Sequence, residues 1–160
     1  MNFTKLDAFM DEMLLRGYPG CELGVSVGGE VVYRKNVGYA DHARTRLLSG
    51  NDISWVFSCS KVITCTAALQ LWEKGLFSLE DKLSDYMPEF KEMVVKEADG
   101  TLRPAKTQIT IKDLFCMTAG FSYNLNSPMI QKCKEETNGR CQTRELMKYL
   151  SKEPLLFEPG

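Results

Sequence analysis

The sequence lacks the features that define several classes of protein. Its 160 residues carry a formal net charge of only −1. A nearly neutral chain creates no general attraction for nucleic acid or for an anionic membrane, so neither is an expected partner. It also has no run of about 18 apolar residues, the length that could span a bilayer. Met1–Asp7 contains the charged residues Lys5 and Asp7, where a signal peptide would need an apolar run. A cytoplasmic protein is therefore expected, unless an export signal has been removed.

Residues arranged to bind a metal are also missing. There is one histidine, His42, and none of the six cysteines forms a Cys-x-x-Cys pair, so neither a metal nor another cofactor is expected. Without a secretory context, free thiols are favoured over a disulfide between Cys133 and Cys141. The remaining cysteines lie in apolar segments and are expected to pack as small core residues. They are Cys21, Cys59, Cys65 and Cys116.

The composition is that of an ordinary soluble domain. Hydrophobic residues make up 44% of the chain and charged residues 26%, which excludes long disordered, collagen-like and coiled-coil structures. The length is sufficient for one domain with a sizeable core.

The first third of the sequence predicts a helix followed by a β-hairpin. Apolar residues at helical spacing indicate an amphipathic helix over Thr4–Arg16. Alternating apolar residues predict a half-buried strand over Cys21–Val27. Gly28-Gly29 then supplies a two-residue turn that tolerates positive φ, and Glu30–Val37 is the second strand.

The middle of the chain predicts a buried helix. Ser58–Lys74 has apolar residues on nearly every side and ends at Gly75. A helix that is apolar all round is buried, so this helix is expected to form the centre of its domain.

Three further segments follow. Lys91–Gln108 is charged and contains an Asp99-Gly100 turn, so it is expected to be an exposed excursion. Thr110 is expected to cap a helix that Gly120 ends. A last helix is predicted over Thr143–Ser151.

Ser58 and Lys61 form a Ser-x-x-Lys motif at the start of the predicted central helix. Residues three apart share a helix face, so the lysine amine can reach the serine hydroxyl. The helix N-terminus favours negative charge developing on the serine oxygen. Burial disfavours a charged lysine, which would allow Lys61 to accept a proton. The pair therefore has the properties of a nucleophile and its base.

The tetrapeptide alone is weak support for catalysis. In a chain of this composition, about one Ser-x-x-Lys match is expected by chance. Ser58 could simply cap the helix while the Lys61 side chain extends to its surface. The expected burial of the helix favours the catalytic interpretation, because a lysine in a buried helix is costly without a function.

Several stretches around this motif resemble the serine β-lactamase-related hydrolases, which include class C-type β-lactamases, D,D-peptidases and esterases. The resemblance covers essentially the whole chain, in order. The stretches are Pro19-Gly20, Gly38–Asp41, Ile53–Lys61, Ala67–Gly75, Leu79–Leu83, Tyr86–Phe90, Ile109–Leu114 and Thr118–Tyr123.

The resemblance implies an α+β fold, with an antiparallel sheet flanked by helices and a helical region. Residues 1–160 would be the N-terminal part of a single catalytic domain. Ser58 would form an acyl-enzyme with a β-lactam, peptide amide or ester, and Lys61 would take its proton. The Ser58 N–H would be half of an oxyanion hole. The expected partners are such a small-molecule substrate, together with the C-terminal part of the same protein or another copy paired through an open sheet edge.

The chain departs from the family pattern in two places. Met117-Thr118-Ala119-Gly120 stands where the family commonly has His-Thr-Ser-Gly, and no Tyr-x-Asn motif is present. Ser122-Tyr123-Asn124 fits Ser-x-Asn but is interpreted as a chance match. Lys106-Thr107-Gln108 lacks the glycine of Lys-Thr-Gly. Phe157–Gly160 resembles the turn that precedes Tyr-x-Asn in the family.

These departures leave a second interpretation open, in which the chain is a non-catalytic ligand-binding or sensing module. Neither Cys59 nor His42 is assigned a catalytic role. Cys59 has no histidine partner and is expected to pack. His42 lies in a polar loop and has no nearby acid or serine.

Overall fold

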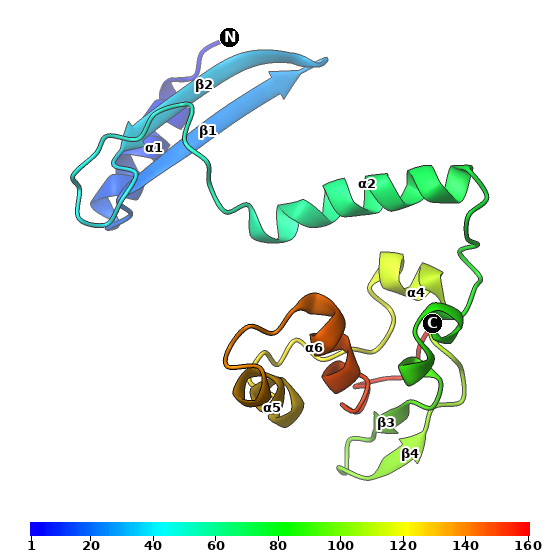
Figure 1. Ribbon diagram of the computed structural model, residues 1–160. Helices are drawn as coiled ribbons and strands as arrows, with labels where there is room; N and C mark the ends of the chain where they lie inside the picture. Colours follow the sequence, from blue (N-terminus) through cyan, green and yellow to red (C-terminus); the bar gives the residue numbers. More distant parts are fainter. The chain divides into compact units, whose positions relative to one another are not determined.

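The computed structural model describes residues 1–160, which divide into two compact units, Met1–Phe57 and Ser58–Gly160. Helices and small antiparallel sheets make up both units, as expected for an α+β protein (Figure 1). Membership of both units in one catalytic domain stays a prediction. No helix has the length and apolar character needed to cross a membrane.

The first unit is the predicted helix and hairpin. Helix α1 spans Thr4–Leu15, and strands β1 (Gly20–Val27) and β2 (Glu30–Gly38) pair antiparallel. Each element agrees with its prediction to within a residue or two. Gly28 and Gly29 form the turn with φ of 60° and 86°, a backbone region that glycine enters without steric cost.

The buried face of the hairpin ends two residues earlier, at Val25, than the sequence alternation predicts. Cys21, Leu23 and Val25 are half-buried, but Val27 is 51% exposed. The pairing register shifts between Val25 and Ser26, and such a bulge interrupts the alternation of sides along a strand. On the covered face, α1 contributes the buried Met10, and its Asp7 binds Lys35 Nζ at 2.9 Å.

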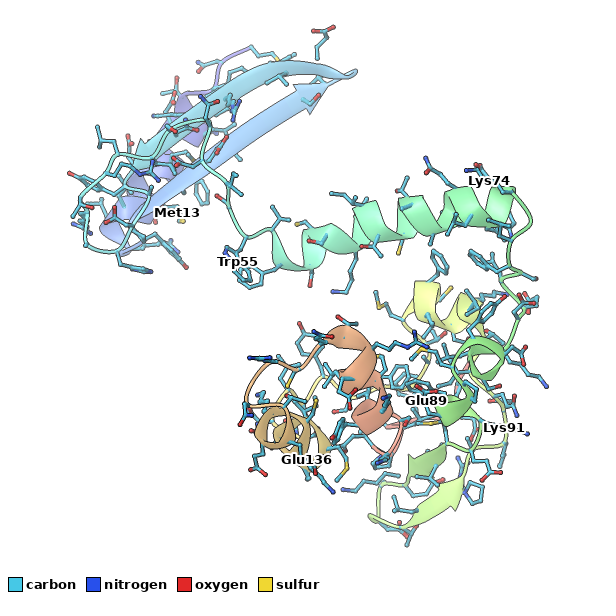
Figure 2. All side chains as sticks on the ribbon, viewed as in Figure 1. Met13, Trp55, Lys74, Glu89, Lys91 and Glu136 are labelled. Carbon is cyan, nitrogen blue, oxygen red and sulfur yellow. The ribbon has the colours of Figure 1, made fainter.

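The second unit begins with helix α2, whose expected burial is wrong. A 3₁₀ turn covers Phe57–Cys59, α2 spans Ser60–Glu73, and Gly75 follows with φ of 68°. The position agrees with the prediction, but no residue of α2 is buried. Figure 2 shows side chains standing out around α2 as far as Lys74 at its end.

The reason is that only one strip of α2 has a neighbour. Cys65 and Ala68 are partly covered where they meet Leu114 and Phe115, whereas Val62 and Ile63 are each 71% exposed. A helix with apolar residues on every side would have to pack against other elements on every side to bury them. The second unit supplies that cover on one side only.

The core of the second unit lies beyond α2. Seven buried residues form one cluster, with the rings of Phe90 and Phe121 packed edge to face at 5.7 Å. The cluster joins the short helices α3 (Leu83–Tyr86) and η2 (Pro88–Phe90) to the strands that follow. Its buried members are Leu83, Phe90, Met93, Val95, Ile109, Ala119 and Leu155.

The segment Lys91–Gln108 is largely exposed, as expected, but it forms a hairpin and contributes Met93 and Val95 to this core. Strands β3 (Val94–Lys96) and β4 (Leu102–Pro104) pair antiparallel around the predicted turn. Val95 is only 2% exposed because the C-terminal Leu155 pairs alongside β3. The longest apolar run is Met93–Val95, with charged residues on both sides, and the burial of Val95 depends on a residue distant in sequence.

Helix α4 (Ile111–Cys116) begins as predicted and ends early. Thr110 Oγ1 accepts from Asp113 N at 3.2 Å, while Asp113 Oδ2 accepts from Thr110 N at 2.8 Å, a reciprocal capping box. Met117, with φ of 60°, ends the helix before Gly120. Gly120 instead allows a close approach, because a Cβ there would lie 2.5 Å from Phe157 O.

Helices α5 (Pro128–Glu136) and α6 (Thr143–Leu150) complete the unit. The bounds of α6 agree with the predicted helix to within a residue. Ser127 caps α5 by accepting a hydrogen bond from Ile130 N at 3.4 Å.

The Glu158 carboxylate attaches the C-terminal turn to β4. It binds Arg103 Nη1 at 2.6 Å and accepts hydrogen bonds from the backbone N–H groups of Lys106 and Thr107. The Arg103 guanidinium, assisted by these N–H groups, lowers the pKa of Glu158 from 4.5 to about 2. Ionised Glu158 therefore favours the folded state.

We expect Glu158→Gln to remove an acid-sensitive part of the stability. Since the folded pKa is depressed, the stabilisation is fully present above the ordinary value of 4.5 and is lost as pH falls toward about 2. Thermal melts across pH should show a lower Tm for the variant near neutrality and no difference at the acid end. Glu89→Gln, at an exposed residue without an ion pair, is the control. A difference that persists unchanged at the acid end would contradict this assignment.

Candidate active site

The two residues of the Ser-x-x-Lys motif are in contact. Lys61 Nζ donates a hydrogen bond to Ser58 Oγ at 2.9 Å. Ser58 lies in the 3₁₀ turn, and Lys61 lies in the first turn of α2, so their spacing places both side chains on one face. This is the contact that a serine nucleophile and its base require. Their catalytic roles stay predictions.

The backbone directly before Ser58 has an unusual conformation. Phe57 has φ of 42°, a left-handed value that bulky residues seldom adopt. Such strain is found disproportionately at functional sites. The turn places Ser58 directly before α2, where Cys59 provides no side-chain cap. The first amides of α2 thus have no capping side chain, and their positive end favours negative charge near Ser58.

Both residues are exposed, which departs from the expectation of a buried lysine. Ser58 and Lys61 are exposed for the same reason that α2 is, namely that the second unit does not cover this part of the helix. Desolvation was expected to favour a neutral lysine. Ser58 and Lys61 are thus in contact, but Lys61 is not buried.

The neighbouring cysteine is also exposed, so the expected packing of Cys59 is wrong. Cys116 is exposed as well, whereas Cys21 and Cys65 are partly buried. Cys59 and Cys116 lie next to short apolar stretches that remain uncovered, and apolar neighbours in sequence do not guarantee burial. All six cysteines are free thiols.

The segments that partly match further family motifs make local contacts. Ser122 Oγ accepts a hydrogen bond from Asn124 N at 3.0 Å. The backbone N–H groups of Lys106 and Thr107 bind the Glu158 carboxylate. No hydrogen bond joins any of these residues to Ser58 or Lys61. The contacts seen here are structural, and the interpretation of both segments as chance matches stays a prediction.

The segment that replaces His-Thr-Ser-Gly supports the fold. Thr118 Oγ1 donates to Asp113 Oδ1 at 3.2 Å, and Thr118 N donates to Asp113 O at 2.9 Å. Burial opposes ionisation of Asp113, but hydrogen bonds from Thr110 and Thr118 lower its pKa overall. Met117 is 61% exposed and binds nothing polar through its side chain.

Other candidates for chemistry are scarce. No group of three or more acidic, histidine or cysteine side chains is placed to hold a metal ion. His42 is exposed in the loop after β2 and makes no side-chain hydrogen bond. The Ser58–Lys61 pair is therefore the arrangement best suited to covalent catalysis.

Comparison with known proteins gives consistent matches. The Beta-lactamase family profile matches residues 6–160. The chain is 33% identical over 120 residues to the mitochondrial serine beta-lactamase-like protein LACTB of Homo sapiens, covering 75% of this chain and 20% of that protein. It is 32% identical over 170 residues to a lovastatin esterase of Penicillium rubens, covering 98% and 41%. The chain thus spans less than half of either relative.

A solved structure with the same fold supports these matches. The hydrolase EstCE1, described as having promiscuous acyltransferase activity, superposes with a TM-score of 0.73 at 24% identity. The match covers 98% of this chain and 41% of that structure. At this level of identity the likeness establishes the fold, and it confirms the expected β-lactamase-like architecture.

Proposed function

Since the chain belongs to the Beta-lactamase family, we propose that it contributes the nucleophile and base of a serine hydrolase that acts through an acyl-enzyme. The observation that carries this proposal is the 2.9 Å hydrogen bond between Lys61 Nζ and Ser58 Oγ at the start of α2. Serine hydrolases need a hydroxyl with a base in direct contact and an electropositive environment for the attacking oxygen.

The proposed reaction proceeds in two stages. Ser58 Oγ attacks the substrate carbonyl carbon, and Lys61 Nζ takes the hydroxyl proton. The Ser58 N–H stabilises the negative charge on the carbonyl oxygen as half of an oxyanion hole. The proton then passes to the leaving group, and water hydrolyses the acyl-enzyme. These steps require no metal or organic cofactor.

Within this class we place an ester first, ahead of a β-lactam or peptide amide. One relative is named as an esterase, and the structural neighbour is described as a hydrolase with acyltransferase activity. Esters have better leaving groups than amides and need less assistance from a general acid.

The proposal can be tested by covalent labelling of the protein produced from its complete reading frame. A fluorophosphonate or a penicillin should add to the tryptic peptide Leu47–Lys61, with the adduct on Ser58. Hydrolysis of a p-nitrophenyl ester and of a chromogenic cephalosporin would rank the substrates. An adduct on Cys59, or turnover without any serine adduct, would contradict the proposed chemistry.

A non-catalytic ligand-binding module is the second candidate. Two features favour this candidate. Met117 and Ala119 stand where the family motif has His and Ser, and Ser58 and Lys61 are exposed. A module of this kind would bind a β-lactam or ester reversibly and would show no mass increase. The labelling experiment therefore separates the two functions.

We also propose that the uncovered apolar surface binds further polypeptide, either residues of the same protein beyond this chain or another copy. Exposed apolar residues lie along α2, where Val62 and Ile63 are each 71% exposed. Each large apolar side chain is worth about 1.5–3 kcal/mol when fully buried. The two-stranded sheet of the first unit also has open edges that can pair with another strand.

We expect residues 1–160, expressed alone, to self-associate and to show no turnover. Exposed apolar surface and unpaired strand edges favour association over a monomer. Size-exclusion chromatography and an ester assay would measure both properties. The control is the protein produced from the complete reading frame, including any residues that follow Gly160. A cooperatively melting monomer with Ser58-dependent turnover would overturn this expectation.

A further inference from the structure

Two cysteines lie together where α5 meets α6, in a part of the second unit that the proposed reaction does not use. Cys133, on α5, is fully buried, and Cys141, in the loop before α6, is half-buried. Both are free thiols. They are neighbours, because the hydroxyl of Thr137 forms hydrogen bonds to the backbone of both residues.

Thr137 at the end of α5 holds the two cysteines in place. Thr137 Oγ1 donates to Cys133 O at 2.6 Å and accepts from Cys141 N at 3.0 Å. The same oxygen lies 3.4 Å from Cys141 Sγ. One threonine side chain thus fixes the loop that carries Cys141 onto the last turn of α5.

The backbone of this loop is strained. Asn138 and Cys141 have φ of 51° and 30°, left-handed values that are uncommon for residues other than glycine. Gly139 N donates to Lys134 O at 2.7 Å, which closes the end of α5. The loop therefore reverses tightly and brings Cys141 back over the helix. Strain of this kind persists where the surrounding contacts enforce it.

A hollow in the surface lies next to this position. It has a volume of about 300 Å³ and is lined by Thr137, Arg140, Gln142 and Glu145. Thr137 contacts Cys141 Sγ, and Arg140 and Gln142 flank Cys141 in sequence. The hollow presents a cationic and an anionic side chain. A small zwitterionic peptide has the complementary charges, with carboxylates for Arg140 and an ammonium group for Glu145.

We propose that Cys133 and Cys141 are a redox-active dithiol pair, oxidised to a disulfide by a low-molecular-weight disulfide such as oxidised glutathione. In the first step, the Cys141 thiolate attacks one sulfur of glutathione disulfide, forms a mixed disulfide and releases one glutathione thiolate. In the second step, the Cys133 thiolate attacks Cys141 Sγ and releases the second. Two protein thiols are oxidised and one small disulfide is reduced to two thiols.

The order of attack follows from access. Cys141 is half-buried beside the hollow, while Cys133 is enclosed between the two helices. Burial, with the adjacent Cys141 thiol, raises the pKa of Cys133. The buried thiol is thus a poor first nucleophile and is well placed to resolve a mixed disulfide on its neighbour.

The sequence around the pair allows a direct test on the protein from its complete reading frame. Trypsin cleaves after Lys132, Lys134, Arg140 and Arg144, so each cysteine falls on a short peptide of its own. After treatment with oxidised glutathione, alkylation and digestion, we expect Cys133-Lys134 joined to Cys141–Arg144. The linked peptide should lack two hydrogens relative to the separate thiols and should disappear after reduction. Glutathione retained on Cys141, or both thiols fully alkylated, would overturn the proposal.

Two variants distinguish a built pair from chance oxidation. Cys141→Ser, at a half-buried position, should abolish the linked peptide, whereas Cys116→Ser, at an exposed cysteine, should leave it unchanged. Thr137→Val keeps the side-chain volume and removes the hydroxyl contacts, so closure should slow by about fivefold to tenfold. Unchanged closure in Thr137→Val, or comparable linkage of Cys133 to Cys116, would show that Thr137 does not organise a pair.

Discussion

Replacement of Ser58 by alanine is expected to abolish covalent labelling and to lower kcat by as much as about 10⁶-fold, the scale on which loss of a serine nucleophile acts in another serine hydrolase. The physical reason is that no other hydroxyl accepts the hydrogen bond from Lys61 Nζ. The measurement is ester turnover, together with mass spectrometry after fluorophosphonate treatment.

Ser60→Ala is the matched control for this experiment. Ser60 is an exposed serine at the start of α2, and its hydroxyl makes no hydrogen bond. It should label and turn over like the unsubstituted protein. Labelling that survives Ser58→Ala and disappears in Cys59→Ala would transfer the nucleophile to the thiol and contradict the assignment.

Replacement of Lys61 is expected to have the second large effect, on the rate of acylation. Lys61→Ala should slow acylation by about 10²-fold or more, the usual contribution of a positioned general base. Lys61→Arg should fail nearly as badly, because a guanidinium keeps its proton at working pH. The burst of p-nitrophenol release measures acylation separately from hydrolysis of the acyl-enzyme.

Lys74→Ala, just after α2, is the control for loss of a positive charge. It removes an exposed lysine far along the helix from Ser58 and should leave the burst unchanged. Near-normal acylation by Lys61→Arg would show that the lysine contributes only its charge. The proton would then pass to another group, and the proposed role of Lys61 would be wrong.

Local patterns in the sequence were sufficient for most of the secondary structure. The period-two alternation before Gly28-Gly29 predicts β1 and its turn, and Thr110 before an apolar segment predicts the cap of α4. These features depend on residues within a few positions of one another. The contact between Ser58 and Lys61 has the same origin, because helical geometry alone brings residues three apart together.

Burial was the property that local patterns did not determine. The apolar circumference of α2 predicts a need for cover, yet the helix has a neighbour on one strip only. Conversely, Val95 lies in a charged segment and is buried because Leu155 pairs beside it. The solvent exposure of a residue depends on which residues distant in the sequence pack against it, and hydrophobic periodicity does not predict those contacts.

The sequence by itself thus determined the helix and hairpin of the first unit, the motif at the start of α2 and the membership of its family. The tertiary structure alone decided that Cys133 and Cys141 meet across the α5–α6 loop and that Glu158 binds Arg103. Neither contact lies within a single helix or strand: Cys141 is in the loop after α5, and Glu158 is 55 residues from Arg103. Both contacts form because the chain reverses direction at turns that are strained or held by specific hydrogen bonds. Packing elsewhere in the unit offsets the free-energy cost of those turns.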